Sequence, residues 1–143
     1  MRKTILVLGT AAFLYSCDIR DKEKHSIETV EHAEIKPTTV QLIDSVYDFG
    51  TITEGENVEY SYRFKNTGSE PLVIQNATAS CGCTVPEKPD APIKPGETGY
   101  IKVKYNSDKR PGQAHKTVVV TSNASPAFPD LVITGNVLSK NNQ

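Results

Sequence analysis

The chain has 143 residues, of which 16 are basic and 17 acidic, so its formal net charge at pH 7 is −1. This balance, without a long run of one sign, gives no reason to expect nucleic-acid binding. With 37% hydrophobic residues, no Trp and one Met, the composition predicts one soluble, strand-rich domain with a modest core.

The N-terminal residues have the pattern of an export signal. Arg2 and Lys3 precede an apolar run at residues 5–14, ILVLGTAAFL. This run is too short to cross a bilayer, which takes about 20 apolar residues. A positive start followed by a short apolar core is typical of a secretory signal peptide. We therefore expect the protein to be exported.

The end of this run contains a cysteine in a distinctive setting. Leu14-Tyr15-Ser16-Cys17 resembles the lipobox of bacterial lipoproteins, with an aliphatic residue three positions before the cysteine and a small residue directly before it. The resemblance implies a signal peptide at residues 1–16, cleavage before Cys17 and a diacylglycerol on its sulfur. Several acyl chains, palmitate for example, would anchor Cys17 firmly in a lipid bilayer, because each buried CH2 contributes about 0.8 kcal/mol. The alternative is an ordinary signal peptide with an incidental cysteine.

The segment after Cys17 is highly charged. Residues 18–36 contain six acidic and four basic side chains in nineteen positions. Such a segment buries too little apolar surface to offset the entropy lost on ordering. We expect residues 17–37 to be a lipidated, disordered tether between the membrane and a folded domain.

From residue 38 onward, apolar and polar residues alternate as they do in half-buried strands. The clearest case is residues 58–65, VEYSYRFK. Further short apolar or alternating runs occur at residues 40–42, 72–74, 101–105, 118–120 and 131–133. Turn residues separate them, and Pro95-Gly96 predicts a type II turn with Pro95 at its second position. Residues 38–140 are therefore predicted to form an all-β fold, an antiparallel immunoglobulin-like sandwich of about seven strands.

Five phrases in this part of the chain carry a family resemblance. They are YDFGTITEGE, YRFKNTGSEPLVI, SCGCTVP, PIKPGETGYIKVKY and HKTVVVTSN. Together they resemble the bacterial domain of unknown function family one-five-seven-three, over residues 45–137, and its hallmark Ser-Cys-Gly-Cys-Thr is intact at residues 80–84. The resemblance implies a sandwich similar to abnormal-spindle, hydin and major-sperm-protein-like domains. Those relatives are mostly interaction and scaffold modules, so the resemblance implies a fold rather than an activity.

Cys81 and Cys83 flank one glycine within this hallmark. Along a straight strand, residues two apart lie about 6.6 Å from each other, at the edge of the Cα separation of about 4.4 to 6.8 Å that a disulfide needs. Gly82 would allow closure by adopting a positive φ that bends the backbone. A disulfide closing so small a ring would be strained and open to thiol exchange. The other interpretation of the pair is structural, as small side chains where two backbones approach closely.

A metal site is a further alternative for the same cysteines. Two thiolates are soft ligands that suit Cu(I) or zinc. His115 is the one histidine inside the predicted domain, and it would complete a three-ligand set with Cys81 and Cys83 if the fold brought them together. The leading expectation is nonetheless that the protein has no cofactor.

No catalytic set emerges from the pattern of residues. Phosphate-binding glycine motifs and a nucleophile with a base are both missing from the sequence. The leading prediction is a lipoprotein of the cell envelope, in the outer membrane at its periplasmic face or at the surface. It would not be an enzyme, and its immunoglobulin-like domain would bind an envelope protein partner. The alternative is a metal-binding or thiol-disulfide redox module at the Cys-Gly-Cys motif.

Overall fold

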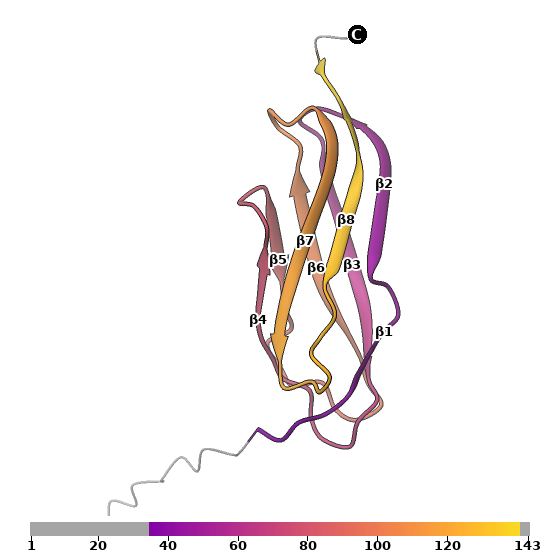
Figure 1. The fold of residues 1–143 in the computed structure, drawn as a ribbon, viewed down its shortest axis with the longest axis vertical. Coiled ribbons are helices and arrows are strands. Elements are labelled where there is room, and N and C mark those ends of the chain that lie inside the picture. Colours follow the sequence, from indigo (N-terminus) through magenta and orange to yellow (C-terminus); the bar gives the residue numbers. More distant parts are fainter. Residues whose placement is uncertain (1–34, 141–143) are drawn as a thin grey trace, which may run out of the picture. The chain divides into compact units, whose positions relative to one another are not determined.

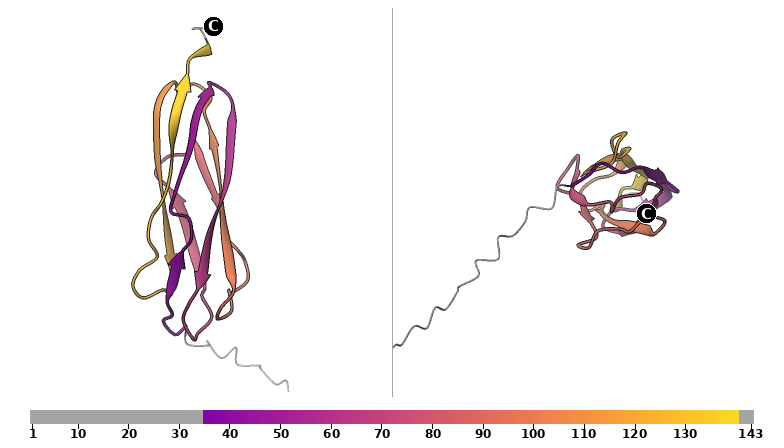
Figure 2. Two further views of the ribbon diagram at one scale, coloured as in Figure 1. Left: turned by 90° about the vertical axis from the view of Figure 1, so that its right-hand side faces the viewer. Right: turned by 90° about the horizontal axis from the view of Figure 1, so that it is seen from below.

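The computed structural model describes residues 35–140, which form eight strands in two four-stranded sheets (Figure 1; Figure 2). The strands are β1 (Val40–Leu42), β2 (Val46–Thr53), β3 (Asn57–Asn66), β4 (Ile74–Ala79), β5 (Thr84–Glu87), β6 (Thr98–Asn106), β7 (Gly112–Ser122) and β8 (Leu131–Leu138). The predictions for the signal peptide, Cys17 and most of the tether fall on residues 1–34, outside the described residues. Within residues 35–140 no helix is long and apolar enough to cross a membrane.

One sheet has the strand order β1-β3-β6-β5 and the other β2-β8-β7-β4. Neighbouring strands are antiparallel except β2 and β8, which run parallel with Val46 opposite Val132. The consecutive strands β1 and β2 thus belong to different sheets, so the chain passes from one layer to the other between them (Figure 1). The all-β, immunoglobulin-like sandwich is confirmed, with one more strand and one more parallel pair than expected.

Two of the eight strands, β2 and β5, match none of the six runs that the sequence pattern identified, for physical reasons. Strand β2 contains a register shift between Asp48 and Thr51, which interrupts the alternation of its apolar side chains. Strand β5 has only four residues and includes Pro86, and a proline argues against a strand unless the strand lies at an edge. Both strands do lie at sheet edges.

Alternate residues of the central strands supply the core between the sheets. Tyr62 and Phe64 of β3 are buried, as are Ile101 and Val103 of β6. Opposite them, Leu131 of β8 belongs to the same apolar cluster. The period-two prediction for β3 and β6 is therefore confirmed, because successive side chains of a strand point to opposite faces.

The turn before β6 also follows its prediction. Gly96 has a φ of 80°, and the Glu97 N–H donates to the Lys94 carbonyl oxygen at 3.0 Å. These are the features of a type II turn, whose third residue has a positive φ. The turn positions the start of β6, which pairs with both β3 and β5.

Candidate functional site

The Cys-Gly-Cys motif lies in the tight turn that links β4 to β5, and therefore links the two sheets. On the β4 side, the Ser80 N–H donates to the Thr117 carbonyl oxygen of β7 at 2.9 Å. On the β5 side, the Asn106 N–H of β6 donates to the Cys83 carbonyl oxygen at 2.9 Å. Backbone hydrogen bonds to both sheets thus hold the turn in place.

The two cysteines form a disulfide with a Cα separation of 5.3 Å. This separation is well inside the usual range. Gly82 does not bend the backbone through a positive φ, the route that the sequence suggested, since it is not among the glycines with positive φ. A backbone hydrogen bond closes the turn instead, from the Thr84 N–H to the Cys81 carbonyl oxygen at 3.2 Å. The bend is therefore produced by an ordinary turn.

The two sulfurs have different surroundings. Cys83 is only 6% exposed and belongs to an apolar cluster with Tyr105, Ala114 and Ile133. Cys81 is partly buried and packs against the outside of this cluster. Cys83 is therefore the more enclosed of the two residues, although it also lines the hollow described below.

A buried hydroxyl lies next to both sulfurs. Thr84 is 3% exposed, and its Oγ1 is 3.6 Å from the Cys81 Sγ and 3.8 Å from the Cys83 Sγ. A threonine hydroxyl has one proton to donate. Sequence reasoning missed Thr84 as a site residue, although its position directly after Cys83 in the family hallmark was a usable signal.

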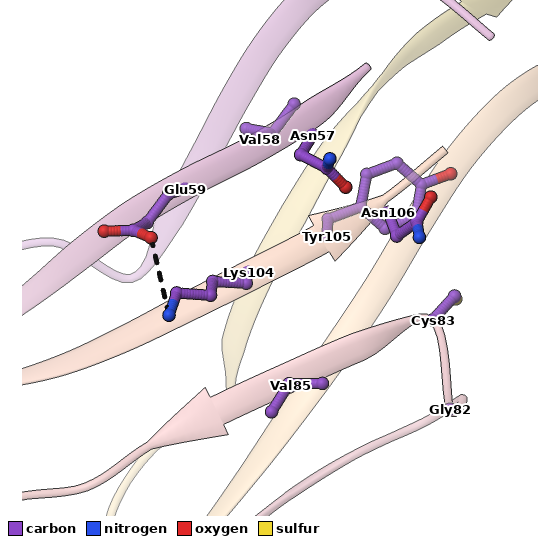
Figure 3. Close-up of a pocket in the computed structure, with 9 residues that line it drawn as sticks. All are labelled: Asn57, Val58, Glu59, Gly82, Cys83, Val85, Lys104, Tyr105 and Asn106. Carbon is purple, nitrogen blue, oxygen red and sulfur yellow. Dashed lines mark ion pairs between the residues drawn. The ribbon is translucent and has the colours of Figure 1, made fainter. Parts of the chain in front are cut away.

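A hollow of about 240 Å³ opens beside the disulfide, between the ends of β3, β6 and β5 (Figure 3). Its walls combine apolar and polar groups: Val58, Val85, Gly82, Cys83, Tyr105, Asn57, Asn106, Glu59 and Lys104. At one end, the Lys104 Nζ lies 3.8 Å from the Glu59 Oε2 and 2.6 Å from the Glu87 Oε1. The hollow can therefore receive a small group with one apolar side, next to the disulfide.

The charges around this hollow stabilise one another. The hydrogen bond from Lys104 lowers the pKa of Glu87 below its usual range. The same bond raises the pKa of Lys104. Both groups therefore stay charged at neutral pH. The Lys104 ammonium group forms its ion pairs with the carboxylates of Glu59 and Glu87.

The structure does not bring His115 to the cysteines. His115 is exposed on β7, whereas its neighbour Ala114 is buried and packs with Cys83. Successive residues of a strand face opposite sides, so the imidazole lies on the outer face of the sheet. Among residues 35–140, no group of three or more His, Cys, Asp or Glu side chains is placed to hold a metal ion. The copper or zinc hypothesis therefore gains no support in this part of the chain.

A comparison with protein-family models assigns this sequence to a family. The model of the family described as protein of unknown function (DUF1573) matches residues 40–137. The chain belongs to this family. The match confirms the family resemblance that the Ser-Cys-Gly-Cys-Thr hallmark helped to identify. The matched residues include the whole turn with both cysteines. No curated protein matches the sequence.

Solved structures share the fold of this DUF1573 domain at low sequence identity. A protein of unknown function from Porphyromonas gingivalis has a TM-score of 0.61 and 14% identity, covering 71% of this chain and 48% of that one. The ASH/PapD-like domain 7 of human CEP192 has a TM-score of 0.54 and 11% identity, covering 72% and 87%. The secreted serine protease VesC from Vibrio cholerae has a TM-score of 0.51 and 11% identity, covering 70% and 23%.

These similarities concern the fold alone. The chain spans about half of the P. gingivalis protein and about a quarter of VesC. It spans about nine tenths of the human domain. The PapD-like likeness agrees with the immunoglobulin-like architecture that the strand pattern predicted.

Proposed function

We propose that this protein is a lipid-anchored lipoprotein of the cell envelope that binds an envelope protein partner through one exposed sheet edge and performs no catalysis of its own. The observation that carries this proposal is the edge of β4. A free strand edge presents unpaired N–H and C=O groups to which an extended segment of another protein can add.

Three of the four sheet edges carry features that oppose such pairing. Strand β1 has three residues, and β2 contains the register shift between Asp48 and Thr51. Strand β5 includes Pro86 and the charged Glu87. Short strands, bulges, prolines and charges are the usual means of blocking an edge. Strand β4, with the sequence IQNATA, is six residues long and has neither proline nor charge. Its own register shift lies at its start, between Ile74 and Asn76, and residues 76–79 after it pair regularly with β7.

The register of β4 identifies its free backbone groups. Ser80 donates to Thr117 of β7, and Thr78 lies opposite Val119. Because antiparallel strands alternate between hydrogen-bonded and non-bonded pairs, the backbone groups of Ala77 and Ala79 face away from β7. The Ala77 N–H donates to the Asn76 Oδ1 at 2.9 Å, so the N–H of Ala79 is the donor that remains for an added strand.

The anchoring part of the proposal rests on the sequence. The signal-like N-terminus and the Cys17 setting predict attachment to a bilayer, and the charged residues 18–36 would let the domain reach a partner. Cells fed an alkyne-bearing fatty acid should label the wild-type protein but not the variant Cys17→Ala, and the variant should leave the membrane fraction. Equal labelling of both proteins would contradict the anchor.

The edge is tested by removing one N–H. Ala79→Pro deletes an edge donor at a position where proline is tolerated, because that N–H is not used in the sheet. Crosslinking in intact cells followed by mass spectrometry should give a partner that is enriched with wild type and lost with Ala79→Pro. Thr78→Ala, in the same strand, is the matched control and should retain the partner. Retention by the proline variant would contradict the edge proposal.

A further inference from the structure

We propose an activity beyond this binding role: the Cys81–Cys83 disulfide exchanges with a dithiol on another molecule, and Cys81 is the sulfur that is attacked. Thiol exchange requires an accessible disulfide sulfur, a leaving sulfur that tolerates charge, and a pair that stays close enough to close again. The turn between β4 and β5 supplies a structural basis for each requirement.

The two cysteines of the disulfide differ in exposure. Gly82 is exposed, and a Cβ added to it would meet no atom within 4 Å, so the outside of the turn is open. Cys81 is partly exposed there, whereas Cys83 is 6% exposed. An incoming thiolate therefore reaches the Cys81 sulfur more readily.

The reaction has two steps. In the first, a thiolate of the dithiol attacks the Cys81 Sγ, a mixed disulfide forms, and the bond to Cys83 breaks. Its electron pair leaves with the Cys83 sulfur, which takes a proton from water. In the second step, the other thiolate of the dithiol attacks its own partner sulfur in the mixed disulfide and releases Cys81, which is protonated in turn. The protein gains two electrons and two protons, and the dithiol becomes a disulfide.

Thr84 assists the leaving sulfur. A thiolate forming among Tyr105, Ala114 and Ile133 is disfavoured by its apolar surroundings. The Thr84 hydroxyl, 3.8 Å from the Cys83 Sγ, is close enough to turn its proton toward the developing charge. We assign Thr84 as a positioning residue that stabilises the Cys83 thiolate.

The turn does not depend on the disulfide for its shape. The Thr84 N–H to Cys81 carbonyl bond closes it, and the bonds of Ser80 and Cys83 to the neighbouring strands fix its two ends. These backbone contacts remain when the sulfurs separate. The reduced cysteines would therefore stay near each other, and the pair would close again with an oxidant.

Accessibility is tested on the folded protein with dithiothreitol as the dithiol. Acid quenching, alkylation and intact mass should show two alkylated cysteines without denaturant, while the near-ultraviolet circular dichroism is unchanged. A disulfide that yields only after denaturation would overturn the proposal. Loss of the folded signal upon reduction would overturn it as well, since the bond would then be structural.

The direction of attack is tested with single-cysteine variants. Cys83→Ser keeps the thiol of Cys81 and should react with Ellman's reagent about tenfold faster than Cys81→Ser, which keeps the enclosed thiol of Cys83. Equal rates, or the reverse order, would overturn the assignment of Cys81.

The role of Thr84 is tested by Thr84→Val, which keeps the shape and removes the hydroxyl. Reduction by dithiothreitol should slow about tenfold, corresponding to one lost hydrogen bond to a charged group. Thr84→Ser should restore the rate, and Thr78→Val is the control that should not change it. An unchanged rate in folded Thr84→Val would overturn this role.

Discussion

Asn66 illustrates how a single buried amide connects distant parts of this domain. It is fully buried, and its Oδ1 accepts from the Thr38 hydroxyl at 3.0 Å. Its Nδ2 donates to the carbonyl oxygens of Glu70 at 2.8 Å and Ile93 at 2.9 Å. A buried polar group is favourable only when its hydrogen bonds are satisfied. Asn66 therefore joins the segment before β1 to two loops at the same end of the sandwich.

Replacing this amide should be costly. Asn66→Ala removes four side-chain hydrogen bonds, because the Gly68 N–H also donates to the Oδ1, and we expect it to lower the free energy of unfolding by about 3 kcal/mol. Urea denaturation measures the change. The control Asn76→Ala removes an exposed amide and should stay within about 0.5 kcal/mol of wild type. Equal effects of the two variants would contradict the role of Asn66.

At the scale of the strands, the outer face of β3, β6 and β5 carries a network of opposite charges. Lys102 and Lys104 of β6 lie between Glu59 of β3 and Glu87 of β5, at distances of 2.6 to 3.8 Å. Exposed pairs of this kind contribute little individually because water and salt screen them. Their arrangement follows the strand order β3-β6-β5, and the charges discourage pairing of β5 with another chain.

The network predicts a small acid dependence. The hydrogen bond from Lys104 lowers the pKa of Glu87 in the folded state, so its contribution is present at neutral pH and is lost as the pH falls through that lowered pKa. Glu87→Gln should have a slightly lower Tm than wild type at pH 7, and this difference should vanish well below about pH 4, where the carboxylate is protonated.

Thermal unfolding from pH 7 to pH 3 measures this effect. Asp90→Asn is the control, because Asp90 is exposed and belongs to none of the ion pairs of residues 35–140. It should show no such convergence with wild type. A difference between Glu87→Gln and wild type that does not shrink between pH 7 and pH 3 would show that charge pairing is not its cause.

For the domain as a whole, the core rather than the disulfide should determine stability. The disulfide links residues only two apart, and a loop of that size adds at most about 1.6 kcal/mol by constraining the unfolded chain. The double variant Cys81→Ala/Cys83→Ala should therefore fold, with a decrease in unfolding free energy of about that size or less. Chemical denaturation measures it, and a decrease above about 4 kcal/mol would instead identify a structural staple.

Local patterns in the sequence were sufficient for several features of this protein. The alternation at residues 58–65 identified β3, and Pro95-Gly96 identified the type II turn before β6. Both features depend on residues near each other in the chain. The Ser-Cys-Gly-Cys-Thr hallmark led to the family. The broken alternation of β2 and the proline of β5 hid those strands, since their pairing partners are distant in sequence.

Only the tertiary structure decided what surrounds the cysteines. The sequence left disulfide, metal and structural interpretations open, because a metal site with His115 depends on the distance between separate strands and the disulfide depends on the bend of the turn. The structure joins Cys81 to Cys83, puts the Thr84 hydroxyl beside both sulfurs and turns His115 to the opposite face of its sheet. The free edge of β4 is likewise a property of strand order, which is determined by pairing between strands that are distant in sequence.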